Sequence, residues 1–355
     1  MIAFTSSGTG GHIYPCIALA EELPENEFYF ICSTDRKDRE IINRYGFSFS
    51  AIASERKNLL KIFSNFFKAR GILKQHKTRV LVSSGGYFTF PVVLAAASLK
   101  IPIFLLEQNI LPGRVNRYLA MFATKIFISF SEAAKHFPRK KTVFSGNPIR
   151  NFNLKDEVYN NLLKIDLPKN CYKVLIFGGS QGALAINKLF FDNYDYFLDQ
   201  DFVLIQVTGS SFYHKVKGKY PKEAQENKDF LIITNSKGEN KIIVIPYFEN
   251  MAYLYETANL VIARSGATTV SELEAFQKQA ILIPFPFAKD NHQFYNAKFY
   301  EKLNLGKLIL ESDLSFELLL NKINEFKMNK DQPKVNNNFL PNRAKVIILN
   351  DLKNC

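Results

Sequence analysis

The sequence predicts an α/β fold made of two Rossmann-like domains. Short runs rich in β-branched and aromatic residues alternate with helical patterns along the whole chain, which is typical of parallel sheets with crossover helices. A glycine-rich turn lies near the start of each half, at 7–12 and at 178–182. The length of 355 residues is more than one hydrophobic core usually serves. We therefore expect two domains, each with its own parallel sheet.

Six strands are expected in the first half and five in the second. Those of the first half are Met1–Thr5, Glu27–Ser33, Val80–Ser83, Ile103–Leu106, Lys125–Ile128 and Thr142–Phe144. Those of the second half are Lys173–Phe177, Phe202–Thr208, Ile242–Ile245, Leu260–Ala263 and Ala280–Pro284. The polar segment from Arg150 to about Tyr172 is expected to be a linker. A second polar stretch, Asp331–Asn342, precedes a last apolar run at Val346–Leu352.

The composition fits a soluble globular protein, with 47% hydrophobic and 22% charged residues. The four cysteines are scattered without zinc-binding spacing, so we expect a reducing cytoplasm and no structural metal. The first glycine turn begins at residue 7, so we expect no secretion signal. The most apolar stretch, Pro91 to Leu106, is interrupted by Lys100 and Pro102 and is shorter than the roughly 20 residues of a membrane-spanning helix. It predicts a core helix followed by a buried strand.

Positive charge is concentrated in the first half of the chain. The net charge is +13, and residues 1–150 carry 21 of the 46 basic residues but only 10 of the 33 acidic ones. The stretch from Arg56 to Arg79 holds eight basic residues, no acidic residue, and apolar residues near helical spacing. This pattern fits an amphipathic helix on an anionic membrane, but the stretch by itself favours a surface helix with a solvated basic face and an apolar face on the core. No nucleic-acid-binding motif accompanies the charge, so we expect no nucleic-acid partner.

The first glycine turn, Gly8-Thr9-Gly10-Gly11-His12, follows an expected strand and precedes a helix start. Such turns expose backbone amides and the positive end of a helix to phosphate groups. The turn departs from the dinucleotide-binding fingerprint because Ile13 occupies the third glycine position. Histidine titrates near neutral pH, so His12 is a candidate general base for a hydroxyl group; the alternative is a capping or surface residue.

A second turn, Gly178-Gly179-Ser180-Gln181-Gly182, follows the apolar run 174–177. It is expected to place Ser180 and several amides at a helix N-terminus, where a diphosphate would fit. The alternative is a tight strand-to-helix turn whose glycines serve packing. The pattern does not match the G-x-S-x-G elbow of hydrolases.

A third candidate site follows the expected strand Leu260–Ala263. Arg264-Ser265-Gly266 is followed there by a helix that carries Glu272. A carboxylate on the first turns of that helix can accept two vicinal hydroxyls of a sugar, or can serve only the helix dipole. Farther along the chain, the amides of the polar loop 290–293 either bind sugar hydroxyls or cap the next helix.

Seven ordered motifs resemble the MurG family, the family 28 glycosyltransferases that transfer N-acetylglucosamine from UDP to lipid I in bacterial peptidoglycan synthesis. They are Gly8-Thr9-Gly10-Gly11-His12, Gly85-Gly86-Tyr87, Glu107-Gln108-Asn109, Gly146-Asn147-Pro148-Ile149-Arg150, Gly178-Gly179-Ser180-Gln181-Gly182, Arg264-Ser265-Gly266-Ala267 with Thr269-Val270-Ser271-Glu272, and Gln293 with Asn296. The resemblance covers residues 1 to about 310.

The resemblance implies a GT-B fold, in which two Rossmann-like domains with parallel sheets face each other across a cleft. It implies an acceptor and membrane-associating domain over 1–155, to which residues of about 335–355 return, and a domain over 156–334 that binds UDP-N-acetylglucosamine. It also implies lipid I as acceptor, peripheral attachment to the cytoplasmic face of the inner membrane through Arg56 to Arg79, and room for cell-wall synthesis proteins as partners. No cofactor is implied. No D-x-D triplet lies within these motifs, since Asp199-Gln200-Asp201 stands outside them, so no catalytic metal is expected.

The resemblance also assigns site residues. His12 would take the proton from the C4 hydroxyl of N-acetylmuramic acid, with inversion at the anomeric carbon of the donor. Ser180 would face the diphosphate, and Phe248 would lie beside uracil. Glu272 would hold the ribose hydroxyls, and Gln293 would bind the sugar hydroxyls. The full set implied for UDP-N-acetylglucosamine is Thr9, Gly10, Gly11, Asn109, Arg150, Ser180, Phe248, Ala267, Thr268, Thr269, Val270, Ser271, Glu272 and Gln293.

The sequence departs from the usual family pattern at Ser7, Phe90, Leu106 and Phe248, which concerns acceptor geometry and uracil packing rather than the reaction class. Three other functions stay open. One is another lipid-acceptor GT-B enzyme, such as a diacylglycerol glycosyltransferase or a lipid A disaccharide synthase. The second is a nucleotide-sugar-binding protein or membrane scaffold without turnover, and the third is a dehydrogenase, which NAD binding would reveal.

Overall fold

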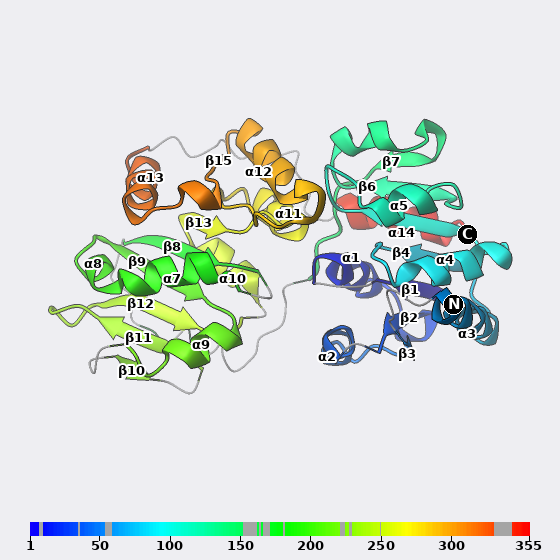
Figure 1. The fold of residues 1–355 in the computed structure, drawn as a ribbon, viewed down its shortest axis with the longest axis horizontal. Coiled ribbons are helices and arrows are strands. Elements are labelled where there is room, and N and C mark those ends of the chain that lie inside the picture. The colour runs from blue at the N-terminus through cyan, green and yellow to red at the C-terminus, as the bar shows by residue number, and fades with distance from the viewer. Residues whose placement is uncertain are drawn as a thin grey trace. The chain divides into compact units, whose positions relative to one another are not determined.

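The chain forms two compact units, one over Met1–Asn151 with Phe339–Cys355 (unit 1) and one over Phe152–Asn338 (unit 2) (Figure 1). The computed structural model describes residues 1–6, 10–34, 36–53, 59–151, 162, 165, 171–179, 182–220, 224–226, 229–248, 250–329 and 343–355. The expected linker after Arg150 and the polar stretch 331–342 lie almost entirely outside the described residues.

Unit 1 contains a seven-stranded sheet in the order β3-β2-β1-β4-β5-β6-β7, and every neighbouring pair is parallel. The strands are β1 (Ile2–Thr5), β2 (Phe28–Ser33), β3 (Phe49–Ile52), β4 (Val80–Ser83), β5 (Ile103–Glu107), β6 (Lys125–Ile128) and β7 (Thr142–Phe144). Its helices are α1 (Gly10–Ala20), α2 (Arg36–Arg44), α3 (Leu59–Gln75), α4 (Thr89–Ser98), α5 (Arg114–Leu119) and α14 (Arg343–Lys353). Short 3-10 helices lie at Glu25–Glu27, Ser131–His136 and Arg139–Lys141.

Alternate residues of β1 enter two different cores, because successive side chains of a strand point to opposite faces of the sheet. Ala3 belongs to the core beneath α3, α4 and α5. Ile2 and Phe4 belong to the core beneath α1 and α14, to which the last helix contributes Ile348 and Leu352. The end of the chain is therefore part of the first unit's interior.

Unit 2 contains an eight-stranded sheet in the order β10-β11-β12-β9-β8-β13-β14-β15. The strands are β8 (Tyr172–Phe177), β9 (Phe202–Val207), β10 (Gln225–Glu226), β11 (Leu231–Thr234), β12 (Asn240–Ile245), β13 (Leu260–Ala263), β14 (Gln279–Leu282) and β15 (Gly306–Leu308). The helices are α7 (Leu184–Asp192), α8 (Tyr194–Leu198), α9 (Ser210–Val216), α10 (Met251–Thr257), α11 (Ala267–Ala275), α12 (His292–Lys302) and α13 (Phe316–Met328), with 3-10 helices at Lys289–Asn291 and Glu311–Asp313. Helices α7, α8, α9 and α13 cover one core of this sheet.

The predicted α/β class with parallel sheets is confirmed, with one correction at the edge of unit 2. There β11 pairs antiparallel with both β10 and β12, so this sheet is mixed. The reason is a tight turn after β11, where Gly238 donates its amide to Asn235 and returns the chain along its neighbour. Strands β3, β10, β11 and β15 were absent from the prediction.

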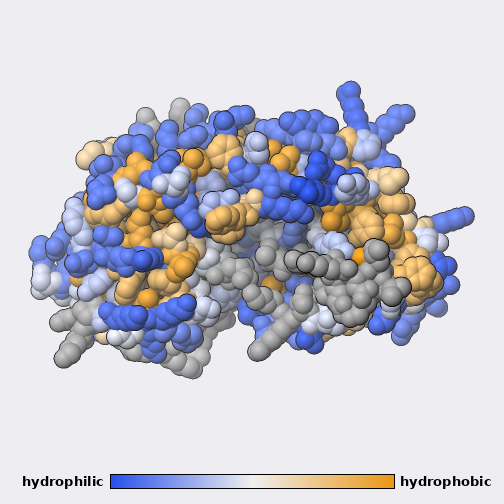
Figure 2. Space-filling model, viewed as in Figure 1, coloured by the Kyte–Doolittle hydropathy of each residue, from blue (hydrophilic) through white to orange (hydrophobic). Residues whose placement is uncertain are grey.

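The predicted helix within the basic stretch is confirmed as α3. Phe63 and Phe67 on this helix are 65% and 53% exposed, and their rings pack edge to face at 4.9 Å. Figure 2 shows apolar side chains among hydrophilic ones over the part of unit 1 where Figure 1 draws α3 and α4. Among the described residues, no helix combines the length and the apolar character that crossing a membrane requires.

Candidate active site

The candidate site of unit 1 lies where β1, β4 and β5 end and α1 begins. In parallel sheets the carboxyl ends of the strands share one edge, and ligands bind there. Gly10 and Gly11 open α1, and Gly11 is exposed. Ser7, Gly8 and Thr9 lie outside the described residues, so the structure says nothing of the expected contact of Thr9.

His12 is oriented by two carbonyl oxygens. Its Nδ1 lies 3.0 Å from the backbone oxygen of Ser84 and 3.2 Å from Oε1 of Gln108. Both partners are acceptors, so Nδ1 carries the proton and the neutral ring has its lone pair on Nε2. The side chain is half-buried. This arrangement provides a proton acceptor with a fixed tautomer at the carboxyl edge of the sheet.

Gln108 is itself fixed by the backbone. It is 1% exposed, and its Nε2 donates to the carbonyl oxygen of Leu106 at 3.1 Å, which leaves Oε1 turned toward His12. The sequence motifs indicated a role for Asn109 but none for Gln108. A glutamine directly after a buried strand, at the sheet edge where His12 also lies, is the signal that would have indicated it.

Asn109 is placed by a buried carboxylate. Glu107 Oε1 accepts from the backbone N–H of Asn109 at 2.9 Å, and Oε2 accepts from the N–H of Gly113 at 3.1 Å and from Nδ2 of Asn116 at 3.0 Å. Burial raises the pKa of the Glu107 carboxyl, and these donors act in the opposite direction. The loop 108–113 is therefore organised around one side chain that the sequence analysis left without a role.

Asn116 lies against the glycine turn that follows β4, at Gly85. Gly85 has a φ of +88°, and a Cβ atom there would lie 2.7 Å from Oδ1 of Asn116. Only glycine satisfies both the left-handed backbone and this close approach. The turn after β4 and the loop after β5 are therefore packed together, beside His12.

Arg150 lies against helix α1. Its guanidinium carbon is 4.2 Å from the ring centroid of Tyr14, two residues after His12 in α1, and the side chain is 8% exposed. A cation over an aromatic face at this distance is a stabilising contact. Of the predicted residues, Gly10, Gly11 and His12 thus lie in α1, Arg150 contacts the same helix at Tyr14, and Asn109 adjoins Gln108.

In unit 2, Glu272 is buried in the second turn of α11. It is 5% exposed, and its Oε2 accepts a hydrogen bond of 2.8 Å from the hydroxyl of Tyr255 in α10. Gly266 caps the helix, and the predicted residues Ala267, Val270 and Ser271 are buried while Thr268 and Thr269 are half-buried. The carboxylate therefore has an interior position close to the helix N-terminus.

Gln293 is joined to the segment that follows β14. Its Oε1 accepts from the backbone N–H of Phe285 at 2.9 Å, and its backbone oxygen accepts from Ser265 Oγ at 2.8 Å. Asn296, fully buried, donates from Nδ2 to the backbone oxygen of Ser265 at 3.2 Å. These bonds connect the start of α12 to the turn before α11.

Arg264, which follows β13, is bonded to the segment after β14 and to Glu311. Its Nη1 donates to the backbone oxygens of Ile283 and Pro284 at 3.2 and 3.1 Å, and its Nη2 forms an ion pair with Glu311. The side chain is 8% exposed. Arg264 is therefore a structural centre of the unit 2 edge, a role that the sequence motif did not indicate.

The glycine turn after β8 is tight. Gly182 has a φ of +73°, and a Cβ atom there would lie 2.5 Å from the backbone oxygen of Thr208. Ser180 and Gln181 lie outside the described residues, so the expected diphosphate contact of Ser180 has no structural description.

The predicted uracil neighbour, Phe248, is buried. It is 3% exposed, with its ring 6.5 Å from that of Tyr253.

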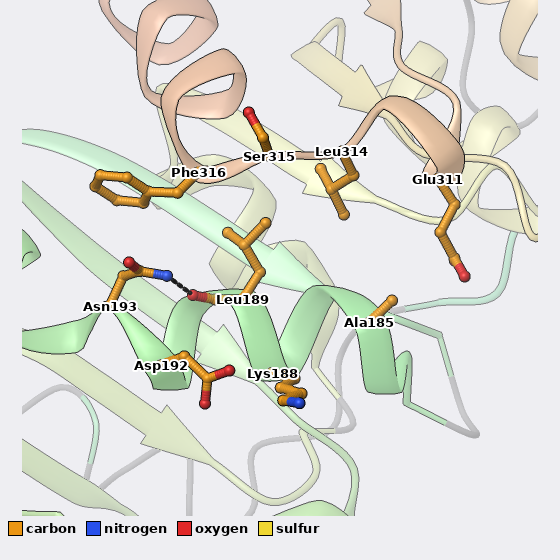
Figure 3. Close-up of a pocket in the computed structure, with 9 residues that line it drawn as sticks. All are labelled: Ala185, Lys188, Leu189, Asp192, Asn193, Glu311, Leu314, Ser315 and Phe316. Carbon is orange, nitrogen blue, oxygen red and sulfur yellow. Dashed lines mark hydrogen bonds between the residues drawn. The ribbon is translucent and has the colours of Figure 1, made fainter.

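A further pocket of about 350 Å³ lies between α7 and the segment that precedes α13 (Figure 3). Leu189 and Leu314 point toward each other across it. Its lining includes Glu311, the partner of Arg264, but none of the predicted site residues.

No group of three or more His, Cys, Asp or Glu side chains suited to a metal ion occurs in the described part of the chain.

Comparison with known proteins gives a consistent result along the chain. Residues 2–128 match the glycosyltransferase family 28 N-terminal domain, and residues 173–348 match the family 28 C-terminal domain. A Halothermothrix orenii protein named UDP-N-acetylglucosamine–N-acetylmuramyl-(pentapeptide) pyrophosphoryl-undecaprenol N-acetylglucosamine transferase is 39% identical, over 91% of this chain and 89% of that protein. A protein of the same name from Caldanaerobacter subterraneus is 35% identical, over 90% of this chain and 89% of that protein.

A solved structure agrees with these relatives. The crystal structure of MurG from Acinetobacter baumannii has a TM-score of 0.73 and 25% identity, and the match covers 99% of each chain. The predicted GT-B class is thereby confirmed. The chain belongs to glycosyltransferase family 28 and, within it, to the MurG family.

Proposed function

We propose that the protein transfers N-acetylglucosamine from UDP-N-acetylglucosamine to the C4 hydroxyl of N-acetylmuramic acid in lipid I, undecaprenyl-pyrophosphoryl-MurNAc-pentapeptide, and so forms lipid II. Membership of the family and the names of the two relatives support this reaction. Within the structure, the observation that carries it is the orientation of His12. Its Nδ1 faces two carbonyl oxygens, which gives Nε2 the lone pair that a general base needs.

The reaction is a single displacement. Nε2 of His12 takes the proton of the C4 hydroxyl while the hydroxyl oxygen attacks C1 of the donor sugar. The bond between C1 and the diphosphate oxygen breaks, UDP leaves with the electron pair, and the configuration at C1 inverts. The carbonyl of Ser84 accepts from Nδ1 throughout, so the ring stays oriented as the imidazolium forms.

The donor-binding residues form the second part of the proposal. Glu272 accepts the ribose hydroxyls, Phe248 lies beside uracil, and Gln293 binds the sugar. Ser180 and the amides of the turn after β8 face the diphosphate, where amides and a helix N-terminus offset the charge that develops on UDP. Thr9, Gly10, Gly11, Asn109 and Arg150 contribute from unit 1, and Ala267 to Ser271 bring the backbone of α11 close to the nucleotide. No metal or cofactor is part of the proposed reaction.

Attachment to a membrane is the third part. The exposed rings of Phe63 and Phe67 lie on the same helix as Lys68, Arg70 and Lys74. Aromatic side chains enter the headgroup boundary while basic ones bind anionic lipid headgroups. We propose that α3 docks unit 1 on the cytoplasmic face of the cell membrane, where the lipid acceptor is anchored.

The test is transfer of labelled N-acetylglucosamine from its UDP donor to a lipid I analogue in detergent. The wild type is expected to form product. His12→Ala is expected to lose activity by about two to four orders of magnitude while retaining UDP binding. His214→Ala, which removes an exposed histidine on α9, is the matched control and is expected to keep full activity.

Three other results of this assay would each contradict a different part of the proposed function. Full activity in His12→Ala removes this residue as the base. Absence of wild-type product with lipid I, together with product on diacylglycerol or on a lipid A precursor, moves the protein to another lipid acceptor. UDP-N-acetylglucosamine binding without product on any of these acceptors favours a binding protein.

A further inference from the structure

A buried tyrosine connects two helices at the candidate donor site. Tyr255 in α10 is 0% exposed, and its hydroxyl donates to Glu272 Oε2 in α11 at 2.8 Å. Along the chain, α10 comes before β13 and α11 comes after it, so this bond joins the two helices that flank that strand in the sequence. Phe248 lies in the segment that leads into α10. The tyrosine therefore links the two segments proposed to hold uracil and ribose.

The ring of Tyr255 is held by its neighbours. Its centroid lies 6.0 Å from that of Phe177, the last residue of β8, and 5.4 Å from that of Phe276, which follows α11. A ring packed between two others has few alternative rotamers, so its hydroxyl has one direction. The hydrogen bond to Glu272 is therefore set by packing.

We propose that Tyr255 is a positioning residue for ribose recognition, whose hydroxyl holds the Glu272 carboxylate in the orientation in which it accepts the hydroxyls of the donor's ribose. This inference rests on the proposed function of Glu272. A carboxylate has about four acceptor positions, so the bond from Tyr255 fixes the plane of the group and still allows it to accept from further hydroxyls. Hydrogen bonds to a charged acceptor are among the stronger ones in proteins.

The hydrogen bond from Tyr255 is expected to affect the preference for ribose over 2′-deoxyribose as well as the affinity for the nucleotide. A carboxylate with a fixed plane matches two vicinal hydroxyls, and the match is worse when the 2′ hydroxyl is missing. Without the tyrosine hydroxyl the carboxylate loses the hydrogen bond that sets its plane, so ribose loses more binding free energy than 2′-deoxyribose does. Tyr255 should therefore contribute to the preference for a ribonucleotide.

The experiment compares the binding of UDP and 2′-deoxy-UDP by calorimetry, together with kcat and KM for UDP-N-acetylglucosamine. Tyr255→Phe removes one oxygen and retains the packed ring. Tyr300→Phe is the matched control, because Tyr300 is also 0% exposed in unit 2 and donates its hydroxyl to a backbone oxygen, that of Lys278. Glu272→Gln and the double variant Tyr255→Phe/Glu272→Gln complete the set.

In Tyr255→Phe, KM is expected to rise about tenfold with kcat little changed, and the preference for UDP over 2′-deoxy-UDP is expected to fall by about the same factor. Tyr300→Phe should keep the wild-type preference. In the Glu272→Gln background, Tyr255→Phe should have little further effect, since the two side chains act together.

The proposal is overturned if Tyr255→Phe keeps the wild-type preference, or if the effects of Tyr255→Phe and Glu272→Gln are additive. Equal binding of UDP and 2′-deoxy-UDP by the wild type would also overturn the proposal, together with the ribose role of Glu272. The transfer reaction to lipid I is tested separately by the activity assay. If Tyr255→Phe does not fold, Phe276→Leu loosens the ring and keeps the hydroxyl. A smaller drop in preference then supports the proposal, and an unchanged preference contradicts it.

Discussion

Ser84 and His12 lie 72 positions apart in the chain, yet the backbone oxygen of Ser84 is 3.0 Å from Nδ1 of His12. Their pairing follows from β1 and β4 being neighbours in the sheet, because the turns after both strands emerge at the same edge. A backbone carbonyl is uncharged and cannot be removed by a side-chain substitution. Gln108 provides the second contact, and that contact can be changed.

We expect Gln108→Glu to change the pH dependence of the reaction. A carboxylate next to Nδ1 would stabilise the imidazolium form of His12, so Nε2 would stay protonated to higher pH. The acidic limb of kcat/KM should then shift upward by about one pH unit. Gln75→Glu, which adds the same charge at the exposed end of α3, should leave the limb in place. An unshifted limb in Gln108→Glu would mean that His12 is not the group that titrates in the rate.

Gly85→Ala should disrupt the loop that carries Asn109. The new Cβ would lie 2.7 Å from Oδ1 of Asn116, and alanine would have to adopt a φ of +88°. We expect a loss of about 2–3 kcal/mol in the free energy of unfolding, measured by urea denaturation, and reduced transfer activity. Gly71→Ala is the matched control, since Gly71 lies inside α3 with no atom near its Cβ position. That variant should be more stable by about 0.5–1 kcal/mol, and equal losses in both would contradict the explanation.

Glu274 predicts a pH-dependent stability of unit 2. Burial raises the pKa of its carboxyl to about 7, compared with about 4.5 in the unfolded chain. The protonated form is therefore favoured by folding, and its contribution is complete below pH 4.5 and is lost as the pH rises through 7. Glu274→Gln should be more stable than the wild type by about 2 kcal/mol at pH 8, with little difference at pH 4.5.

The measurement for Glu274 is chemical denaturation at both pH values. Glu256→Gln serves as control because Glu256 is exposed in the same unit, and it should leave the pH dependence of stability as in the wild type. A Glu274→Gln variant whose advantage over the wild type is equal at both pH values would show that the carboxyl does not titrate in this range.

The proposed membrane surface of α3 predicts a lipid-binding defect. Phe63→Ser/Phe67→Ser removes two exposed rings without opening a core, so the variant should fold normally. Its binding to vesicles that contain anionic phosphatidylglycerol should fall by about tenfold or more, measured by co-sedimentation. Tyr196→Ser, which removes an aromatic ring that is 48% exposed in unit 2, should bind as the wild type does. Equal binding by both variants would place the membrane contact elsewhere.

Most strands that the sequence predicted are buried on both faces, although the edge strand Thr142–Phe144, which has no buried residue, was predicted as well. Val80–Ser83 and Leu260–Ala263 are uniformly buried and read as continuous apolar runs. The strand Phe49–Ile52 was not predicted because it is an edge strand with one buried residue, and β10 has only two residues. In these segments the hydrogen bonds of the sheet, rather than a local pattern, decide the conformation.

The candidate site was predictable to a similar extent. Motifs identified His12 and Glu272, because turns and helix starts carry local signals. They did not identify Tyr255 as the partner of Glu272, or Glu311 as that of Arg264, since each pair is brought together by the order of strands in the sheet. Leu106 was treated as a departure from the family pattern. Its side chain is 2% exposed in the core, and its backbone oxygen accepts from Gln108 and Asn116.

The position of α14 has a consequence for synthesis of the protein. Ile348 and Leu352 belong to the same core as Phe4 and Phe104, and Lys345 bonds to both Glu22 and Asn151. The first unit is therefore encoded by both ends of the chain, with the whole second unit made in between. On the ribosome, α14 cannot complete the cover of this core until it has been made, so the second unit, which precedes α14 in the chain, has the earlier opportunity to fold to completion.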